Sequence, residues 1–209
     1  MKLGKPFPRL YPILDVGCLP DRELTTVIHF AEELASAGCS ILQYRNKISS
    51  PREILFHARE LKRVLGNHLA LIMNDRADLA LGAGFDGVHV GQDDLTPDAA
   101  RLVIGRELVL GVSTHNPQQL TDADNTSADY VAIGPVFTTS TKMNPDPVMG
   151  LEKLRAAREL TSKPLVAIGG ITRTNVGDVI RAGADSVAVI ADLLASPRKS
   201  AEEFLKALQ

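Results

Sequence analysis

Short apolar runs alternate with stretches of helical periodicity along the whole chain. The run at residues 10–14 is followed by residues 22–37, where apolar residues recur at helical spacing and Gly38 supplies a stop. Strict alternation of strands and helices is typical of parallel β/α proteins. Parallel strands buried on both faces read as continuous aliphatic runs, as residues 165–168 do. The pattern therefore predicts a parallel sheet covered by helices.

The alternation continues to give eight strand–helix units. The predicted strands are residues 10–14, 40–44, 69–73, 87–90, 108–112, 130–133, 164–168 and 185–190. The predicted helices are residues 22–37, 51–65 and 77–81, two that start at Pro97 and Pro117, one that ends at Leu160, and residues 174–182 and 199–208. Eight units in 209 residues favour an α/β fold of one domain, a (β/α)8 TIM barrel. A doubly wound open sheet is the alternative, but the turn after the first strand lacks the G-x-G-x-x-G pattern of dinucleotide-binding sheets.

Composition and charge narrow the classes of partner. The chain is 44% hydrophobic, enough for one buried core, and its formal net charge of −2 argues against nucleic acid or an anionic membrane as partner. No apolar run is long enough to span a membrane, and no apolar segment near Met1 resembles a secretion signal. Cys18 and Cys39 have neither metal-site nor C-x-x-C spacing. We expect a cytoplasmic protein, and a homo-oligomer is compatible with the sequence.

Polar residues gather just after the predicted strands, where the active sites of such barrels are built. Gln43, Arg45 and Lys47 alternate along the second strand, so an extended chain points all three to one side. Two cations and an amide in one mouth suit a phosphate or pyrophosphate. The alternative is a charged loop in water.

Acidic residues follow the third and fourth strands. Asn74 and Asp75 come after one apolar run, and Asp93 and Asp94 come after the next. Asp75 with one of the other two could bind Mg²⁺, which takes carboxylate oxygens and keeps waters and substrate phosphates as its remaining ligands. The alternative is that these carboxylates cap the helices that follow them.

The later strands also end in polar or glycine-rich segments. Ser113 could donate a hydrogen bond into the mouth, but no base is placed to make it a nucleophile. His89 and His115 could each simply bond a neighbouring backbone group, which is the interpretation we favour for His115. The longest loop, residues 134–150, offers Thr139, Thr141 and Lys142 as donors to a phosphate unless it is a disordered insertion. Gly169 and Gly170 let the backbone approach a ligand, and the standard phosphate site of these barrels lies between the seventh and eighth loops.

Taken in order, these segments resemble the thiamine-phosphate synthase family over residues 11–194. The resemblance rests on Gln43-x-Arg45-x-Lys47, Asn74-Asp75, Gly87-Val88-His89-Val90-Gly91-Gln92-Asp93-Asp94, Leu110-Gly111-Val112-Ser113, Gly134-Pro135-Val136-Phe137 with Thr139-x-Thr141-Lys142, and Ala167-Ile168-Gly169-Gly170-Ile171. The family joins 4-amino-5-hydroxymethyl-2-methylpyrimidine pyrophosphate to a thiazole phosphate and releases pyrophosphate. The resemblance implies a dissociative reaction, in which pyrophosphate leaves before the thiazole nitrogen adds.

The same resemblance implies a role for each matching residue. Gln43, Arg45, Lys47, Asn74 and Lys142 contact the pyrimidine substrate and its pyrophosphate, and Ser113 lies near the pyrimidine ring. Arg45, Lys47, Ser113 and Lys142 form the catalytic set. Asp75 and Asp94 hold Mg²⁺. Thr139 and Thr141 contact the thiazole, whose phosphate binds Gly170 and the backbone of Ile190 and Ala191.

Two departures bear on this resemblance. Asn46 stands where the family often has Glu, and we expect its side chain to face away from the site. Ala191 and Asp192 stand where the family usually has a serine and a small residue, so a hydroxyl is lost and an acid is placed beside the expected phosphate unless it turns outward. Two other functions remain open: a thiazole tautomerase-like isomerase of the same fold, and a non-catalytic barrel that binds a phosphorylated ligand.

Overall fold

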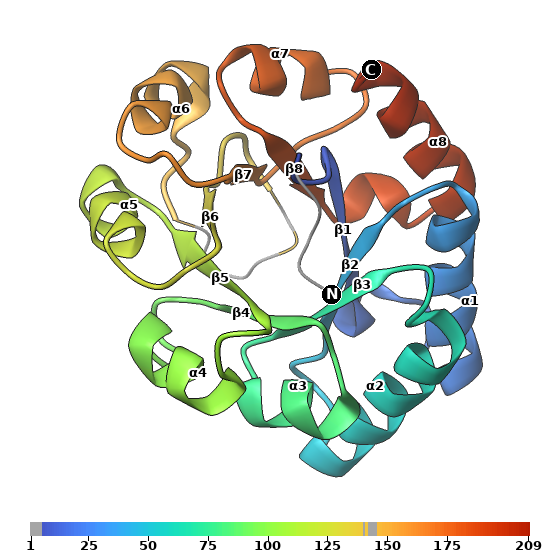
Figure 1. Cartoon of the computed structure of the whole chain (residues 1–209). Helices are drawn as coiled ribbons and strands as arrows, with labels where there is room; N and C mark the ends of the chain where they lie inside the picture. Colours follow the sequence, from blue (N-terminus) through green and yellow to red (C-terminus); the bar gives the residue numbers. More distant parts are fainter. Residues whose placement is uncertain (1–5, 140, 142–145) are drawn as a thin grey trace.

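Each strand pairs in parallel with the next along the chain, and the last strand pairs with the first. The computed structural model describes residues 6–139, 141 and 146–209, and its strands form one closed barrel in the order β1 to β8. Closure is visible end-on in Figure 1, where the helices form an outer ring. It rests on the register of Pro12 with Val189. The predicted (β/α)8 TIM barrel is confirmed, and the doubly wound alternative is wrong.

The strands are short and lie close to the predicted positions. They are β1 (Leu10–Asp15), β2 (Ile41–Arg45), β3 (Ala70–Asn74), β4 (Gly87–Val90), β5 (Val109–Thr114), β6 (Tyr130–Ile133), β7 (Leu165–Ile168) and β8 (Ser186–Val189). The α-helices of the described residues are α1 (Leu24–Ser36), α2 (Pro51–Leu65), α3 (Ala77–Ala83), α4 (Pro97–Ile104), α5 (Pro117–Asp124), α6 (Gly150–Arg158), α7 (Val176–Arg181) and α8 (Pro197–Ala207). Two 3₁₀ turns, η1 (Val16–Cys18) and η2 (Ala191–Leu193), follow β1 and β8.

Several elements differ by a few residues from their predicted bounds, and in two of them the structure shows a local reason. Strand β5 runs two residues beyond the predicted end because Ser113 and Thr114 still pair with β6 and the Thr114 hydroxyl donates to the Ala132 carbonyl. Helix α7 is shorter than predicted because residues 172–175 form a turn, in which the Thr172 amide donates to the Asn175 side chain.

Three helices begin with the same combination of an N-cap side chain and a proline in the first turn. The side chains of Ser50, Thr96 and Asn116 each accept a hydrogen bond from the amide three residues on, and each is followed by proline in the first turn. A side-chain acceptor satisfies an amide that has no partner within the helix, and proline lacks the amide that would be left unpaired. The helix starts predicted at Pro51, Pro97 and Pro117 are thereby confirmed.

Side chains of the strands alternate between two apolar layers. One set faces the helices, and α1 packs against it with Val27, Phe30, Ala31 and Leu34, which are spaced along one helix face. The other set fills the inside of the barrel: Tyr11, Ile13, Ile41, Ala70, Ile72, Val109, Tyr130, Ala132, Val166 and Ala188. None of the helices in the described part of the chain is both long enough and apolar enough to cross a membrane.

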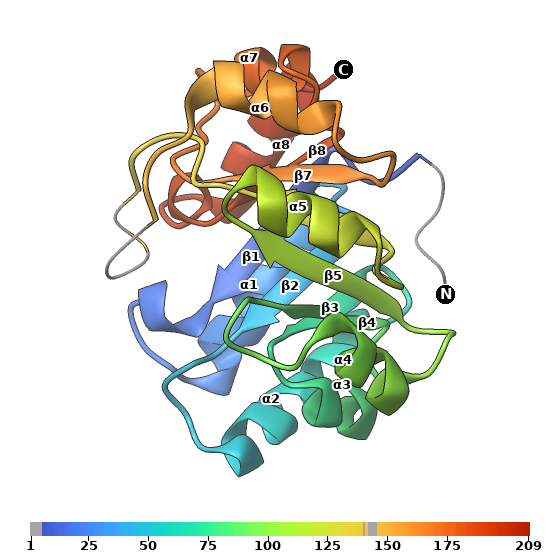
Figure 2. The same ribbon diagram turned by 90° about the vertical axis from the view of Figure 1, so that its left-hand side faces the viewer.

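Aromatic rings close the inside of the barrel below the site. The Phe7 ring lies 5.0 Å from the Tyr130 ring and 6.2 Å from the Tyr11 ring, measured between centroids. Tyr11 and Tyr130 meet edge to face at 5.8 Å, a favourable aromatic geometry. In Figure 2 the β5 arrow points to the side where the loop after β6 projects.

At the rim formed by the amino-terminal ends of the strands, the same combination of a backbone hydrogen bond and an ion pair occurs three times. The carboxylates of Asp86, Asp129 and Asp185 accept hydrogen bonds from the backbone amides of Leu71, Leu110 and Leu165, at the start of the preceding strand. Each also pairs with a cation on the helix that precedes the earlier of the two strands, namely Lys62 on α2, Arg101 on α4 and Arg158 on α6. These three ion pairs therefore hold strands and helices together at this rim.

Candidate active site

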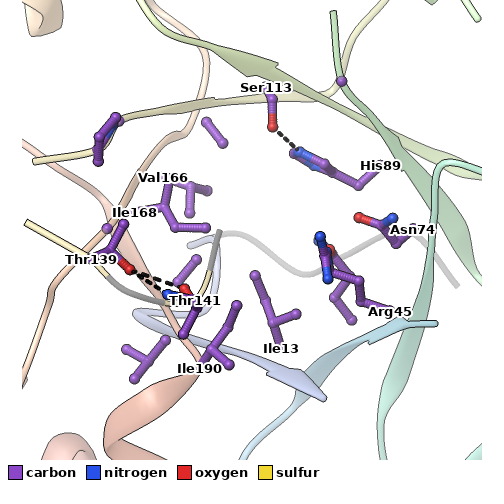
Figure 3. Close-up of a pocket in the computed structure, with 18 of the residues that line it drawn as sticks. Ile13, Arg45, Asn74, His89, Ser113, Thr139, Thr141, Val166, Ile168 and Ile190 are labelled. Carbon is purple, nitrogen blue, oxygen red and sulfur yellow. Dashed lines mark hydrogen bonds between the residues drawn. The ribbon is translucent and has the colours of Figure 1, made fainter. Parts of the chain in front are cut away.

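A cavity of about 780 Å³ opens at the carboxyl ends of the strands. Every strand contributes to its lining: Tyr11, Gln43, Asn74, His89, Ser113, Ala132, Val166 and Ala188 come from β1 to β8 in order. Figure 3 shows Arg45, Asn74, His89 and Ser113 on one side of the space, with Thr139, Thr141, Ile168 and Ile190 on the other. The predicted location of the site at this end of the barrel agrees with the cavity.

The structure brings the predicted site residues to this one cavity, with a single exception. The lining includes Gln43, Arg45, Lys47, Asn74, Asp75, Asp94, Ser113, Thr139, Thr141, Gly170, Ile190 and Ala191. Lys142 lies outside the described residues. Gln43, Arg45 and Lys47 line this cavity together, which favours a binding role for them over a charged loop in water.

Arg45 is held by a buried carboxylate that the sequence reasoning missed. Its guanidinium pairs with Asp15, which is 3% exposed and also accepts a hydrogen bond from the Gly17 amide. Asp15 and Arg45 are register partners at the ends of β1 and β2. Asp15 also follows an apolar run, so the rule that identified Asp75 could have found it. Asn46 faces away from the cavity as predicted, and its side chain bonds the Tyr44 hydroxyl and the Ser49 amide.

Lys47, Asp75 and Asp94 form a charged cluster at the mouth. Lys47 Nζ lies 2.8 Å from Asp75 Oδ2, and the Gly91 amide donates to Asp94 Oδ2 at 2.8 Å. Partial burial and the hydrogen bond with Asp75 raise the pKa of Asp94 above its ordinary value. Asp75 has a φ of 62°, which is uncommon outside glycine and occurs where surrounding structure holds a residue in place.

The capping alternative for these two carboxylates is wrong. Helix α3 has Arg76 at its N-cap with no side-chain bond, and α4 is capped by the Thr96 hydroxyl. Asp75 and Asp94 therefore face each other without serving a helix. Two neighbouring carboxylates repel each other, and a divalent cation relieves that repulsion.

The two carboxylates of Asp75 and Asp94 fit Mg²⁺ better than a metal that takes all of its ligands from protein side chains. Within residues 6–139, 141 and 146–209, no group of three His, Cys, Asp or Glu side chains could hold a metal. Magnesium is commonly bound by one or two carboxylates, with waters and substrate phosphates completing its shell. Asp75 and Asp94 are the residues that would hold it here.

The His89 ring bonds two side chains and not a neighbouring backbone group. Its Nε2 lies 2.8 Å from Ser113 Oγ and its Nδ1 lies 2.9 Å from the Tyr130 hydroxyl. Burial lowers the pKa of His89 to about 4. We predicted that no base is placed for Ser113, and the His89 ring does lie beside it; within the described residues, the ring nitrogens bond Ser113 and Tyr130 and not a carboxylate, so no triad is formed. His115 does bond the backbone, through Nδ1 to the Gly134 carbonyl at 2.8 Å.

The loops after β6 and β7 interlock. A Cβ on Gly170 would lie 2.4 Å from the Thr138 carbonyl oxygen, and Gly170 has a φ of 63°. Glycine is therefore required there to pack the loops together, in addition to allowing close approach of a ligand. The Thr139 and Thr141 hydroxyls hydrogen-bond to each other at 3.0 Å on the cavity wall. Because α7 begins only at Val176, its N-terminus does not directly follow Gly170.

Asp192 is turned toward a cation at the cavity rim. Its Oδ2 accepts from the backbone amide of Arg173 at 2.9 Å and from Arg173 Nε at 3.0 Å. Arg173 also pairs with Glu203 on α8. Because Arg173 offsets the charge of Asp192, the expected conflict between Asp192 and a bound phosphate is reduced. The same ion pair ties the loop after β7 to the loop after β8.

The comparisons with known proteins agree with this geometry. The family model described as thiamine monophosphate synthase matches residues 10–193. A thiamine-phosphate synthase of Koribacter versatilis is 63% identical over 209 residues, covering 100% of this chain and 99% of that protein. One from Chloroflexus aurantiacus is 43% identical over 189 residues, covering 90% and 86%. The solved structure of a thiamine phosphate pyrophosphorylase from Pyrococcus furiosus has a TM-score of 0.84 and 30% identity, covering 96% of this chain and 95% of its own. The chain belongs to the thiamine monophosphate synthase family.

Proposed function

We propose that this chain is a transferase that joins 4-amino-5-hydroxymethyl-2-methylpyrimidine pyrophosphate to thiazole phosphate, giving thiamine phosphate and pyrophosphate. The observation that carries the proposal is the meeting of Arg45, Lys47, Asp75 and Asp94 around the mouth of one cavity. Cations and a metal-binding carboxylate pair suit a pyrophosphate leaving group. Family membership supports the same reaction.

The proposed reaction requires no protein nucleophile. The bond between the pyrimidine methylene carbon and the pyrophosphate oxygen breaks, and its electron pair leaves with pyrophosphate. The thiazole nitrogen then gives its lone pair to the methylene carbon, so no proton has to be removed. Arg45 and Lys47 stabilise the charge that develops on the leaving group. Mg²⁺ held by Asp75 and Asp94 would supply further charge neutralisation at the same oxygens.

The two substrates are assigned to different depths of the cavity. Gln43, Asn74 and Ser113 orient the pyrimidine ring near the barrel interior. Thr139 and Thr141 contact the thiazole, and Lys142 adds a cation to the pyrophosphate. The Gly170 amide and the backbone of Ile190 and Ala191 bind the thiazole phosphate. The interlock of the loops after β6 and β7 supports this division, because it fixes both binding segments against each other.

A coupling assay with purified protein tests the proposal. Both substrates with Mg²⁺ should give thiamine phosphate and one equivalent of pyrophosphate. The variant Asp75→Ala/Asp94→Ala should lose at least about 10²-fold in kcat, the usual order when charge stabilisation is removed. Full activity of that variant in the presence of a chelator would remove the metal assignment. Isomerisation of a thiazole without coupling would instead favour the tautomerase alternative.

The compartment and metal are part of the same proposal. Cys18 and Cys39 are free thiols in the structure, which supports a reducing cytoplasm as the site of the reaction. The chain would act on small phosphorylated molecules and depend on Mg²⁺. Stimulation by Mg²⁺ over Ca²⁺ in the coupling assay is the expected result, because the small ion better suits two carboxylates and a pyrophosphate.

A further inference from the structure

A chain of four hydrogen bonds crosses the inside of the barrel beneath the cavity. Gln43 Nε2 donates to the Tyr11 hydroxyl at 3.2 Å, and the Tyr11 and Tyr130 hydroxyls are 2.8 Å apart. Tyr130 then bonds His89 Nδ1 at 2.9 Å, and His89 Nε2 bonds Ser113 Oγ at 2.8 Å. Figure 3 shows the last of these bonds at the cavity wall.

This series of hydrogen-bonded side chains is buried, and its two end members, Gln43 and Ser113, line the cavity. Tyr130 is 0% exposed, Tyr11 1%, Gln43 3% and His89 7%. Within the described residues, Tyr130 is the member that does not line the cavity. Its hydroxyl fits there because residue 111 is glycine: a Cβ on Gly111 would lie 2.3 Å from it. The glycine thus leaves space for a hydroxyl whose hydrogen-bond partners, among the described residues, are Tyr11 and His89.

With Gln43 Nε2 as the donor to Tyr11, one direction of the hydrogen-bond chain gives every member a partner. Since Gln43 Nε2 donates to Tyr11, the single proton of Tyr11 goes to Tyr130, and that of Tyr130 goes to His89 Nδ1. The imidazole, whose ring contacts two neutral hydroxyls, then carries its proton on Nε2 and donates it to Ser113 Oγ. Two groups remain for a ligand: the carbonyl oxygen of Gln43 as acceptor and the hydroxyl proton of Ser113 as donor.

The free acceptor of Gln43 and the free donor of Ser113 complement one kind of pyrimidine. A 4-aminopyrimidine offers N–H donors at its exocyclic amine and lone pairs at both ring nitrogens. A 4-oxopyrimidine offers an acceptor at the exocyclic position and an N–H donor at N3, so when bound with its exocyclic group at Gln43 it would set two acceptors against each other. To accommodate it, the Gln43 amide, both tyrosine hydroxyls and the His89 tautomer would have to reverse together. Otherwise, buried polar groups would stay unpaired, which is costly.

We propose that this series of hydrogen bonds keeps one donor-to-acceptor direction, and that the protein thereby selects 4-aminopyrimidine over 4-oxopyrimidine substrates. Tyr130 acts as a positioning residue that never touches the ligand. The inference rests on the proposed function, since it concerns the pyrimidine half of that reaction. Sites built on directed hydrogen bonds reject mismatched analogues by about 10³-fold or more in kcat/KM. Breaking the chain in its middle lets each half reorient separately, so this preference should weaken.

The test compares kcat/KM for the 4-amino and 4-oxo pyrimidine pyrophosphates in the protein and in Tyr130→Phe. The unmodified protein should prefer the amino substrate by about 10³-fold, and the variant should lose about tenfold or more of that preference. The control is Tyr44→Phe, which removes an equally buried hydroxyl that bonds Asn46 and His57 outside the barrel. Its preference should stay unchanged. Tyr130→Phe with an unchanged preference would overturn the inference.

A second measurement does not depend on turnover. Nitrogen NMR of the unmodified protein should show His89 with an unprotonated Nδ1 and a protonated Nε2 at neutral pH. The opposite tautomer would reverse the chain and overturn the inference even if Tyr130→Phe fails to fold. Absence of coupling with either pyrimidine would instead contradict the proposed function, while a correct tautomer would still support the direction of the chain.

Discussion

Lys47 Nζ lies 2.8 Å from Asp75 Oδ2, so a proposed ligand of the leaving group and a proposed ligand of the metal neutralise each other. The Lys47 side chain is 50% exposed and that of Asp75 is 18% exposed, which leaves the ammonium accessible to an incoming anion. A metal ion and a pyrophosphate would separate this pair. Lys47 would move to the anion, and Asp75 would turn to the metal.

The first prediction concerns Lys47→Met. Mg²⁺ alone should bind about fivefold more tightly to this variant, because the ion no longer competes with an ammonium for Asp75, and an exposed pair contributes up to about 1 kcal/mol. The coupling rate should fall by about 10²-fold, because charge stabilisation of the leaving group is lost. Calorimetric titration measures the first effect. Lys62→Met, which removes the partner of Asp86 on the opposite rim, is the matched control and should not change Mg²⁺ affinity.

The second prediction concerns Asp15→Asn. Asparagine keeps an oxygen for the Gly17 amide but leaves Arg45 without its carboxylate. The free energy of unfolding should fall by about 1–3 kcal/mol, less than for a fully buried pair because Arg45 is 25% exposed. In addition, kcat/KM for the pyrimidine substrate should fall about tenfold, because the guanidinium is no longer positioned. Denaturant unfolding and steady-state kinetics give both values. Equal stability of the variant and the parent would contradict the pairing.

The third prediction uses the ion pair between the last two loops. Arg173→Ala leaves Asp192 uncompensated beside the proposed phosphate site and should raise KM for thiazole phosphate about fivefold, the effect of one partly screened charge. The double variant Arg173→Ala/Asp192→Ala should return KM close to the parent value. If the double variant is as poor as Arg173→Ala alone, Arg173 contacts the phosphate itself. KM for the pyrimidine substrate serves as the internal control.

The fourth prediction concerns acid stability. His89 has a pKa of about 4 in the folded protein, against an ordinary value of 6.5, because it is buried. Between these values the unfolded chain binds a proton that the folded protein does not, so stability present above pH 6.5 is lost as the pH falls toward 4. The loss should reach about 3 kcal/mol. Unfolding of the parent and of His89→Gln, followed from pH 7 to pH 4, should show this loss only in the parent. The exposed His68→Gln should behave as the parent does.

The fold and the place of the site were predictable because both follow from spacing. Alternating apolar runs and helical stretches determine a parallel barrel, and barrel geometry brings the ends of its strands to one rim. Gln43, Asp75 and Ser113 could thus be assigned to the same cavity although they lie on β2, just after β3 and on β5. This reasoning needed only the position of each residue after its strand.

The contacts among these side chains were not predictable, because they depend on register and on space left by small residues. Asp15 meets Arg45 only because β1 and β2 pair in the register that places them side by side. Tyr130 reaches His89 because Gly111 has no side chain. The direction of Asp192 depends on a backbone turn that puts the Arg173 amide within 2.9 Å. Spacing along the sequence carries none of this information.

Among the described residues, the aromatic rings of Phe7, Tyr11 and Tyr130 fill the inside of the barrel beneath the cavity. A ligand in the proposed site would therefore exchange with solvent through the opening at the carboxyl ends of the strands. We expect a molecule that rests against Tyr11 to bind before, and to leave after, one that occupies this opening.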